Sequence, residues 1–522
     1  MPETPEQELN ARLRRADWRF LLPTPRPRRA RCHGRGPLAD AVASIAGELI
    51  TAGSGGDCDL VVAEQPDSRV LAELHDALRP GGVCYTEWHP GIGGVRRVER
   101  ALGAAGFVDV TCYRPWPASA TLPVYWIPVG APGAAAYVRS RRRLRGGRVR
   151  RLLAGLRQGA RDLLRGWYGG RICAIARRSG DSLGNSTSEG PDAAAWLRNG
   201  WSEWGLGALP DRLSTLLVTG GPRSVSKVVL LAFAEPSPIP LVAVKAPRVD
   251  GATDGVRREG GALASLAARH SGWVPGLPRL LFRREIDGVP MVGETALAGR
   301  PLDSLLAPRS LRAWSMKVAD WLAALADGAP GGSAVHRRNT IVEPALSCFV
   351  EHFGGVVDRG LLRESDGIVR GIGGLPSVPE QRDFGPWNLL VTSAGELAVL
   401  DWESAEMDGL PALDLLYFLA YASFNVDRAH DRESRLASYR RSLDVSTQTC
   451  VVRCDCLARY LDALGLDFAH LGPLRVLVWL IQAQSDFRHA ADDAGGPPAP
   501  EVLARSLFLA LWAEEVRHVA RG

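Results

Sequence analysis

Lysine is nearly absent from this chain of 522 residues. Only three of its 63 basic residues are Lys, namely Lys227, Lys245 and Lys317, and the others are Arg. Where Arg is used by default, a Lys is expected to have a chemical reason, since the compact ammonium serves roles that the guanidinium does not. Lys245 ends an apolar stretch predicted to be a strand, so it is the lysine of greatest interest.

The chain also has no long apolar run and no regular cysteine pattern. The longest apolar runs, 415–422 and 476–481, are much shorter than the roughly 20 residues that span a bilayer. Nine scattered cysteines argue against a disulfide framework. Cys450, Cys454 and Cys456 cluster, but no second Cys or His pair follows at metal-binding spacing, so we interpret them as helix-packing residues. These features predict a cytoplasmic protein.

Charge is unevenly distributed along the chain. Residues 1–180 contain 29 Arg and no Lys against 16 Asp and Glu, which gives +13, whereas the whole chain has a formal charge of +6. The remaining residues therefore carry −7. A basic front joined to an acidic back favours at least two domains.

The order of predicted elements supports a multidomain fold. Strands at 59–63, 83–87 and 107–113 alternate with helices at 68–78 and 95–105, which predicts a parallel, helix-covered sheet. After a small, polar stretch at 182–192, strands at 214–219, 227–234, 241–245, 279–284 and 291–295 and a helix at 257–269 predict a small sheet. Beyond Leu302 the chain is mostly helical. We expect an N-terminal extension (1–29), an α/β domain (30–180), a linker (181–195), a second sheet-bearing lobe (196–296) and a helical lobe (297–522).

The strongest chemical signal is the segment 381–390, Gln-Arg-Asp-Phe-Gly-Pro-Trp-Asn-Leu-Leu, followed by a strand and then Asp401. Phosphoryl transfer needs a carboxylate for the attacking hydroxyl and metal ligands that neutralise the triphosphate. Asp383 and Asn388, five residues apart on one loop, supply a candidate base and a candidate Mg²⁺ ligand. Asp401 supplies a second magnesium oxygen. Alone, either loop residue would be an ordinary turn residue.

These motifs, with Gly409-Leu-Pro-Ala-Leu-Asp414 downstream, resemble the aminoglycoside phosphotransferase family, whose fold is protein-kinase-like. The resemblance covers about residues 196–522. It implies an α+β bilobal fold that uses ATP and Mg²⁺, with an acceptor alcohol held by the helical lobe. The family's loop usually opens with His, whereas this one opens with Gln381.

The resemblance also implies the parts that hold ATP. Lys245 fits the strand lysine that pairs with phosphate oxygens, and Glu259 on the next helix is the candidate partner for its ion pair. Gly220 and Gly221 would let backbone N–H groups approach the phosphates, although hairpin turns also use glycine. The backbone from Glu294 to Ala296 is expected to meet the adenine edge.

The segment 30–178 more weakly resembles a Rossmann-like class I methyltransferase sheet, closed by a strand at 171–177. Binding of S-adenosylmethionine needs a glycine-rich turn after the first strand. Here Cys32-His-Gly-Arg-Gly-Pro37 occupies that place, and too little chain follows for the usual further strand–helix units. We therefore expect a degenerate domain that serves in positioning or assembly and does not use S-adenosylmethionine.

Residues 139–165 contain eleven Arg interleaved with leucines near helical spacing. A basic amphipathic helix can rest on an anionic membrane or contact a partner, or it can pack on its own domain. No nucleic-acid-binding module accompanies it, so nucleic acid is not an expected partner.

Together the residues predict an ATP-dependent phosphotransferase acting on a hydroxyl of a small molecule, such as an aminoglycoside, a sugar, an amino alcohol or a natural-product intermediate. We expect the acceptor near acidic residues such as Glu403, Glu406 and Asp414, although Asp414 could equally anchor the loop. Two alternatives stay open: a bifunctional methyltransferase and kinase, and a catalytically silent scaffold.

Overall fold

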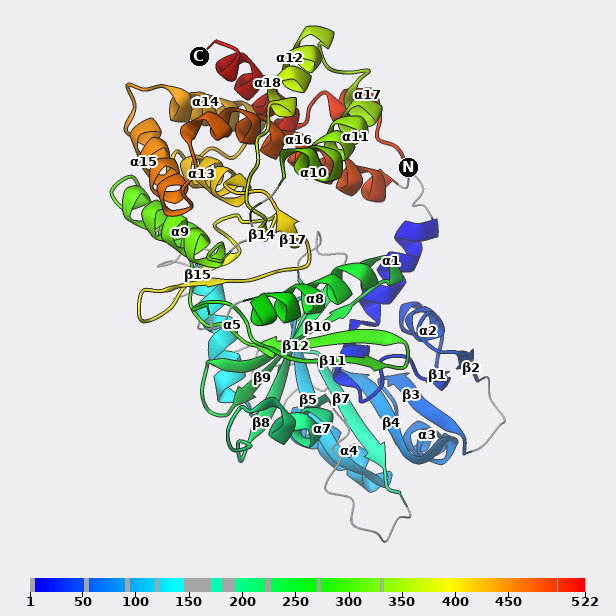
Figure 1. The fold of residues 1–522 in the computed structure, drawn as a ribbon. Coiled ribbons are helices and arrows are strands. Elements are labelled where there is room, and N and C mark those ends of the chain that lie inside the picture. The colour runs from blue at the N-terminus through cyan, green and yellow to red at the C-terminus, as the bar shows by residue number, and fades with distance from the viewer. Residues whose placement is uncertain are drawn as a thin grey trace. The chain divides into compact units, whose positions relative to one another are not determined.

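The computed structural model describes residues 5–50, 56–89, 94–117, 122–144, 170–180, 193–220, 227–269, 274–328, 331, 333–494 and 496–521. The chain forms two compact units. Unit 1 contains Met1–Gly260 and Arg279–Ala296, and unit 2 contains Gly261–Pro278 and Leu297–Gly522. Figure 1 labels most of the elements of both.

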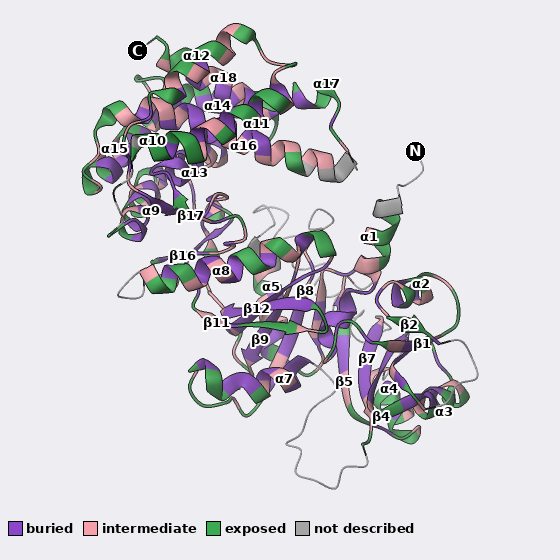
Figure 2. Ribbon diagram, turned by 45° about the vertical axis from the view of Figure 1, so that its right-hand side comes forward, coloured by how far each residue is buried: buried purple, intermediate pink, exposed green. Residues whose placement is uncertain are grey.

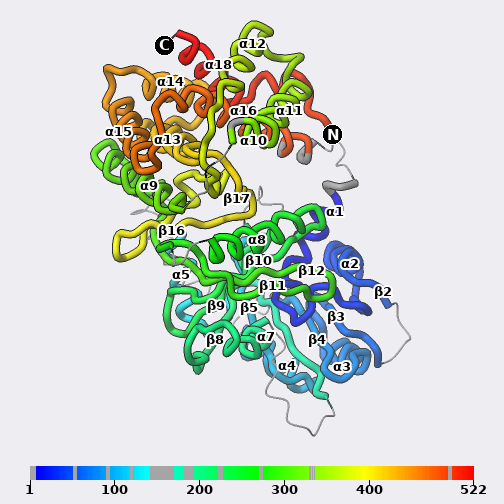
Figure 3. Tube along the Cα trace, in the orientation of Figure 1, coloured from blue at the N-terminus to red at the C-terminus, as the bar shows by residue number. Residues whose placement is uncertain are grey.

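Unit 1 is built on one sheet of twelve strands. In order across the sheet these are β11 (Leu280–Ile286), β12 (Val289–Thr295), β10 (Pro240–Pro247), β9 (Lys227–Ala234), β8 (Leu213–Val218), β6 (Tyr125–Pro128), β5 (Phe107–Trp116), β7 (Ile172–Arg178), β4 (Leu78–Trp88), β3 (Cys58–Glu64), β1 (Arg29–His33) and β2 (Glu48–Leu49). Figure 3 shows the blue strands from the N-terminus and the later green strands within this unit.

The half of the sheet formed by the first 180 residues is mixed. β2, β1, β3 and β4 are parallel neighbours, whereas β7 is antiparallel to both β4 and β5. The connecting helices are α2 (Pro37–Ala43), α3 (Ser68–Ala77) and α4 (Gly94–Ala104). The strands and helices predicted here are confirmed, including the strand that closes this half. The three strands predicted to be parallel, β3, β4 and β5, run in the same direction, and β7 enters the sheet between β4 and β5 in the opposite direction.

The other half is antiparallel throughout, with β8, β9, β10, β12 and β11 pairing in turn. Helix α8 (Thr253–Arg269) follows β10. All five strands and this helix were predicted from the sequence. Register places Lys245 of β10 opposite Val229 of β9 and Val292 of β12, so the lysine lies in the middle of this half.

The predicted boundary at 182–192 does not separate two compact units. β6 pairs with β8 through Tyr125 opposite Val218 and Trp126 opposite Leu217, which joins the two halves into one sheet. One buried apolar cluster also runs through both halves. Figure 2 shows much of the central strands in the colour of buried residues, whereas β11 is largely exposed. Residues 181–192 lie outside the described residues, and helix α7 (Ala193–Gly200) begins inside the expected linker.

The expected N-terminal extension is part of unit 1. Helix α1 (Pro5–Arg15) leads into a 3₁₀ turn, η1 (Asp17–Leu21), whose side chains are buried. The indole of Trp18 stacks on Tyr85 with ring centroids 3.9 Å apart. Asp17 pairs with Arg248 at 2.9 Å, and both side chains are almost fully buried. The segment before residue 30 therefore connects the two halves of the sheet.

Unit 2 is mainly helical. Its helices are α9 (Leu311–Leu325), α10 (Ala334–Arg337), α11 (Glu343–Phe353), α12 (Arg359–Arg370), α13 (Leu413–Val426), α14 (Arg432–Leu443), α15 (Gln448–Ala463), α16 (Leu471–Ala494), α17 (Pro500–Leu503) and α18 (Leu507–Val519). Two small sheets interrupt them, formed by β13 (Arg300–Pro301), β15 (Leu389–Val391) and β16 (Leu397–Val399), and by β14 (Val378–Glu380) and β17 (Glu406–Gly409).

Helix α13 forms the centre of unit 2, since nearly all of its residues are buried.

Among the described residues no single helix is long and apolar enough to cross a membrane, although the bent pair Gln448–Ala463 and Phe468–Arg488 meets the length and composition criteria. All nine cysteines lie within the described residues, and all of them are free thiols. The Sγ atoms of Cys450 and Cys454 lie 3.9 Å apart on α15.

Candidate active site

The loop with the predicted catalytic residues lies in unit 2 between β14 and β15, and Asp401 follows β16. Arg382 and Asp401 have φ angles of 67° and 66°. This left-handed region costs a residue other than glycine about 1–3 kcal/mol and persists only where surrounding contacts enforce it. The backbone just before Asp383 and at Asp401 is therefore held in place by its neighbours.

Three side chains donate hydrogen bonds to the carboxylate of Asp383. Asn388 Nδ2 lies 2.8 Å from Oδ2, Trp387 Nε1 lies 3.4 Å from Oδ2, and the Tyr417 hydroxyl lies 3.4 Å from Oδ1. Burial, and secondarily the nearby charge of Asp401, raise the pKa of Asp383 to about 6. A carboxylate with this pKa is mostly ionised at pH 7 and is a stronger base than an exposed aspartate.

The side chain of Asn388 has a fixed orientation. Its Nδ2 also donates to the backbone carbonyl of Asp383 at 2.9 Å, so both amide hydrogens are directed at Asp383 and Oδ1 remains as the acceptor. The charge of Asp401 is close enough to affect Asp383. An amide oxygen beside two carboxylates is a set that suits Mg²⁺.

In the part of the chain that the structure describes, no three His, Cys, Asp or Glu side chains form a metal-binding group. Magnesium usually takes one or two carboxylates from the protein and the rest of its ligands from phosphate and water.

Gln381 occupies the position that departs from the family pattern, and it joins the loop to the segment with Asp401. Its Oε1 accepts the backbone N–H of Asp383 at 2.8 Å. Its Nε2 donates to the carbonyl of Leu400 at 3.1 Å and to the carbonyl of Asp401. The side chain is fully buried. Glutamine thus bonds both segments without carrying a charge.

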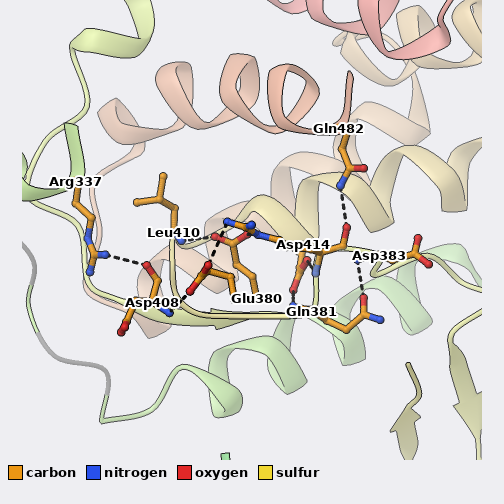
Figure 4. Close-up of polar contacts among 10 residues, drawn as sticks. Arg337, Glu380, Gln381, Asp383, Asp408, Leu410, Asp414 and Gln482 are labelled. Atoms are coloured by element: carbon orange, nitrogen blue, oxygen red, sulfur yellow. Dashed lines mark hydrogen bonds and ion pairs between the residues drawn. The ribbon is translucent and has the colours of Figure 1, made fainter. Parts of the chain in front are cut away.

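Two carboxylates that are buried hold the loop, and Figure 4 labels both. Asp414 accepts the backbone N–H of Gln381 at 2.6 Å and that of Arg382 at 2.9 Å. Glu380 accepts the N–H of Leu410 and pairs with Arg382 at 3.3 Å. Burial, with the charge of Glu380 adding to it, raises the pKa of Asp414 to about 7.

These contacts decide between the two roles considered for Asp414. Its carboxylate is directed at backbone N–H groups of the predicted catalytic loop, which is the anchoring role. Glu406 lies 4.0 Å from Arg382. Gln482 of α16 adds a further bond to this loop, because its Nε2 donates to the carbonyl of Arg382 at 2.9 Å (Figure 4).

In unit 1 the predicted ion pair between Lys245 and Glu259 is present. Lys245 is 6% exposed and Glu259 is fully buried. Glu294 also pairs with Lys245, at 2.8 Å from Nζ, and Lys227 on the neighbouring strand lies 3.9 Å from Glu259. Burial raises the pKa of Glu294 to about 7, although the charge of Lys245 opposes the shift.

Sequence reasoning missed the side-chain role of Glu294 and the position of Lys227. Glu294 was expected to contribute its backbone to adenine binding, but its carboxylate lies on Lys245. The scarcity of lysine could have indicated Lys227, since two of only three lysines meet in one cluster. The charges of the two lysines and the two carboxylates balance in this cluster. An added anion would therefore meet a Lys245 that already pairs with carboxylates of the protein.

The remaining predicted nucleotide contacts are less well supported. Gly220 has φ of 70°, which glycine adopts at little cost, and Gly221 lies outside the described residues. The N–H of Ala296 donates to the carbonyl of Leu241 at 2.9 Å. It is therefore engaged within unit 1 and is not available as a donor to a base.

Two features of the first 180 residues relate to the other predictions. The turn at 34–36 lies between β1 and α2, with Gly34 and Gly36 at φ of 100° and 109°. Of the Arg-rich stretch 139–165, only the part up to Leu144 is described, where it belongs to helix α5 (Pro132–Leu144). A use of S-adenosylmethionine and a surface role for the arginines stay predictions.

No protein-family model and no curated protein sequence matches the chain. Several solved structures of aminoglycoside phosphotransferases match more than half of it. APH(2")-IIia in complex with GDP and kanamycin is 12% identical, covering 61% of this chain and 95% of its own, with a TM-score of 0.35. APH(4)-Ia is 13% identical, covering 61% and 98%, with a TM-score of 0.37. APH(3'')-Id from Streptomyces rimosus is 16% identical, covering 53% and 95%, with a TM-score of 0.30. At TM-scores below 0.5, the function must be inferred from the residues of the chain itself.

Proposed function

We propose that the chain is an ATP-dependent phosphotransferase that transfers the γ-phosphate to a hydroxyl of a small molecule. The observation that carries this proposal is the environment of Asp383. Its carboxylate is half-buried, accepts three side-chain hydrogen bonds, and lies beside a fixed amide oxygen and a second carboxylate. This combination suits a base beside a magnesium site.

Asp383 accepts the proton of the acceptor hydroxyl as that oxygen forms its bond to phosphorus and the bond from phosphorus to the departing ADP oxygen breaks. Asn388 keeps the carboxylate oriented through Nδ2 and offers Oδ1, and Asp401 offers its carboxylate, to the cation. Magnesium and ATP, when bound, supply the phosphoryl group and the charge that screens it. Lys245 would hold phosphate oxygens, with Glu259 fixing the direction of its side chain.

The alternative of a silent scaffold was encouraged only by Gln381. The hydrogen bonds of Gln381 to Asp383, Leu400 and Asp401 are those needed to hold a catalytic loop against a metal-binding segment. These bonds therefore support an active site over a silent scaffold.

The test is a screen of the full-length protein with γ-labelled ATP and pools of hydroxyl compounds, read by mass spectrometry. We expect a phosphorylated product that requires Mg²⁺ and is not formed by Asp383→Asn. Product formation that persists in Asp383→Asn would exclude the assigned base. If no pool is phosphorylated and the protein does not bind MgATP, the proposed activity is wrong.

A further inference from the structure

A pocket of about 380 Å³ lies in unit 2 among α11, α13, α14, α16 and the segment around α17 and α18. Its size is within the range of small-molecule sites. Aromatic rings from four different elements, Phe353, Tyr421, Phe487 and Phe508, form much of its wall. Such walls suit a flat ring, because ring faces and edges pack at centroid distances of about 4.5–7 Å.

One wall of the pocket packs against two side chains that contact the candidate catalytic base. The ring of Tyr421 lies 4.8 Å from that of Trp387 and 4.7 Å from that of Tyr417. Both neighbours donate to the carboxylate of Asp383. The pKa of Tyr421 is raised mainly by burial and further by the charges of both Asp383 and Asp486. Tyr421 therefore lies between the catalytic loop and the pocket.

The charges on the wall are predominantly positive. Arg435 and Arg505 line the pocket against a single carboxylate, that of Asp486. Asp486 is already engaged, because its Oδ2 accepts the hydroxyl of Ser506 at 2.6 Å. A polycation would meet two guanidinium groups here and only one carboxylate.

Arg435 and Arg505 differ from two other arginines of α14, the helix that carries Arg435. Arg440 and Arg441 of α14 pair with Glu514 and Asp427 at 2.8 and 2.6 Å. Within the described residues, no Asp or Glu lies within 4.0 Å of the guanidinium groups of Arg435 or Arg505. Arg435 instead lies over the Tyr421 ring, 5.9 Å from its centroid. Guanidinium groups placed in this way suit a carboxylate or phosphate on a ligand.

We propose that this pocket holds the body of the phosphoryl acceptor, and that the acceptor is a ring-bearing alcohol with an anionic group bound by Arg435 and Arg505. That the ligand is a phosphoryl acceptor rests on the proposed phosphotransferase function. The ring packs against the aromatic wall, and the hydroxyl extends past Tyr421 toward Asp383. The charge of this wall does not suit an aminoglycoside, because an aminoglycoside is a polycation.

The test measures binding to the full-length protein by ligand-observed NMR, without ATP. The probes share a ring and a hydroxyl and differ in charge: 3-phenyllactate is anionic, 3-phenyllactamide neutral and phenylalaninol cationic, with kanamycin as the polycation. We expect phenyllactate to bind about tenfold more tightly than phenylalaninol, the difference of a charge-assisted hydrogen bond. Kanamycin should not displace it.

Arg435→Gln and Arg505→Gln should each reduce this preference for the anion, and Arg432→Gln on α14, which does not line the pocket, should leave it unchanged. The proposal is overturned if phenylalaninol or kanamycin binds more tightly than phenyllactate, if no anionic probe binds, or if both pocket variants keep the preference. Since these measurements need neither ATP nor turnover, their failure is distinct from failure of the proposed activity, which Asp383→Asn and MgATP binding test.

Discussion

The side-chain oxygen of Gln381 accepts the backbone N–H of Asp383 at 2.8 Å, while the amide nitrogen of the same glutamine donates to the carbonyls of Leu400 and Asp401. One neutral side chain thereby fixes the candidate base relative to a candidate metal ligand. Because the group does not titrate, this connection should not depend on pH in the physiological range.

Replacing this glutamine by a residue of similar size without hydrogen bonds tests that connection. Gln381→Met leaves buried backbone groups without partners, so we expect a loss of about 2 kcal/mol in unfolding free energy and a fall in MgATP hydrolysis. Gln381→His, which keeps one donor and one acceptor, should retain more of the rate. The exposed Gln448→Met is the control, and equal activity in the Met and His variants would contradict the role.

The pH dependence of turnover follows from the pKa of Asp383, which burial and Asp401 raise to about 6. A base works in its ionised form, so kcat/KM for ATP hydrolysis should fall as pH decreases through about 6 and level off above it. This fall in kcat/KM at low pH should be absent in Asp383→Asn. A profile without change between roughly pH 5 and 8 would show that Asp383 is not the base.

The two carboxylates on Lys245 should affect nucleotide binding in opposite directions. Glu259→Gln removes the charge that orients the lysine, so MgATP should bind about tenfold more weakly. Glu294→Gln removes a carboxylate that shares Lys245 and repels phosphate, so binding should tighten about fivefold. Isothermal titration checks both, with the exposed Glu285→Gln as control. Changes of the same sign would contradict the competition.

The assignment of Asn388 and Asp401 as magnesium ligands is tested by metal dependence. Asn388→Ala and Asp401→Asn should reduce the gain in ATP affinity that Mg²⁺ gives over EDTA, because each removes an oxygen that the ion needs. Asn425→Ala, at the end of α13, should keep that gain. An unchanged magnesium effect in both site variants would place the metal elsewhere.

Local elements were well predicted from the sequence because their signals are local. The strands around Lys245 and the helices flanking β4 follow from apolar patterning and turn residues. Pairing between distant strands has no such signal. Neither the contact of Trp126 with Leu217 across β6 and β8 nor the burial of Asp17 beside Arg248 could be read from composition, so the polar stretch at 182–192 was mistaken for a domain boundary.

The predictions for the site divide in the same way, into local features that were predicted and contacts between distant segments that were not. The spacing of Asp383, Asn388 and Asp401 is a property of one loop and the next strand, and so it was visible. The second carboxylate on Lys245 depends on β12 pairing with β10, and the arginines facing the pocket come from separate helices. The acceptor was expected near acidic residues that included Asp414, whereas the carboxylate of Asp414 holds the loop backbone.

The most direct test of the central claim compares full-length wild type with Asp383→Asn in Mg²⁺-dependent release of phosphate from ATP, with ATP affinity measured in parallel. We predict that the variant loses at least about a hundredfold in rate, within the range of general-base catalysis, while its affinity for MgATP stays within about threefold. A wild-type rate in the variant, or no MgATP binding by the wild-type protein, would contradict the account.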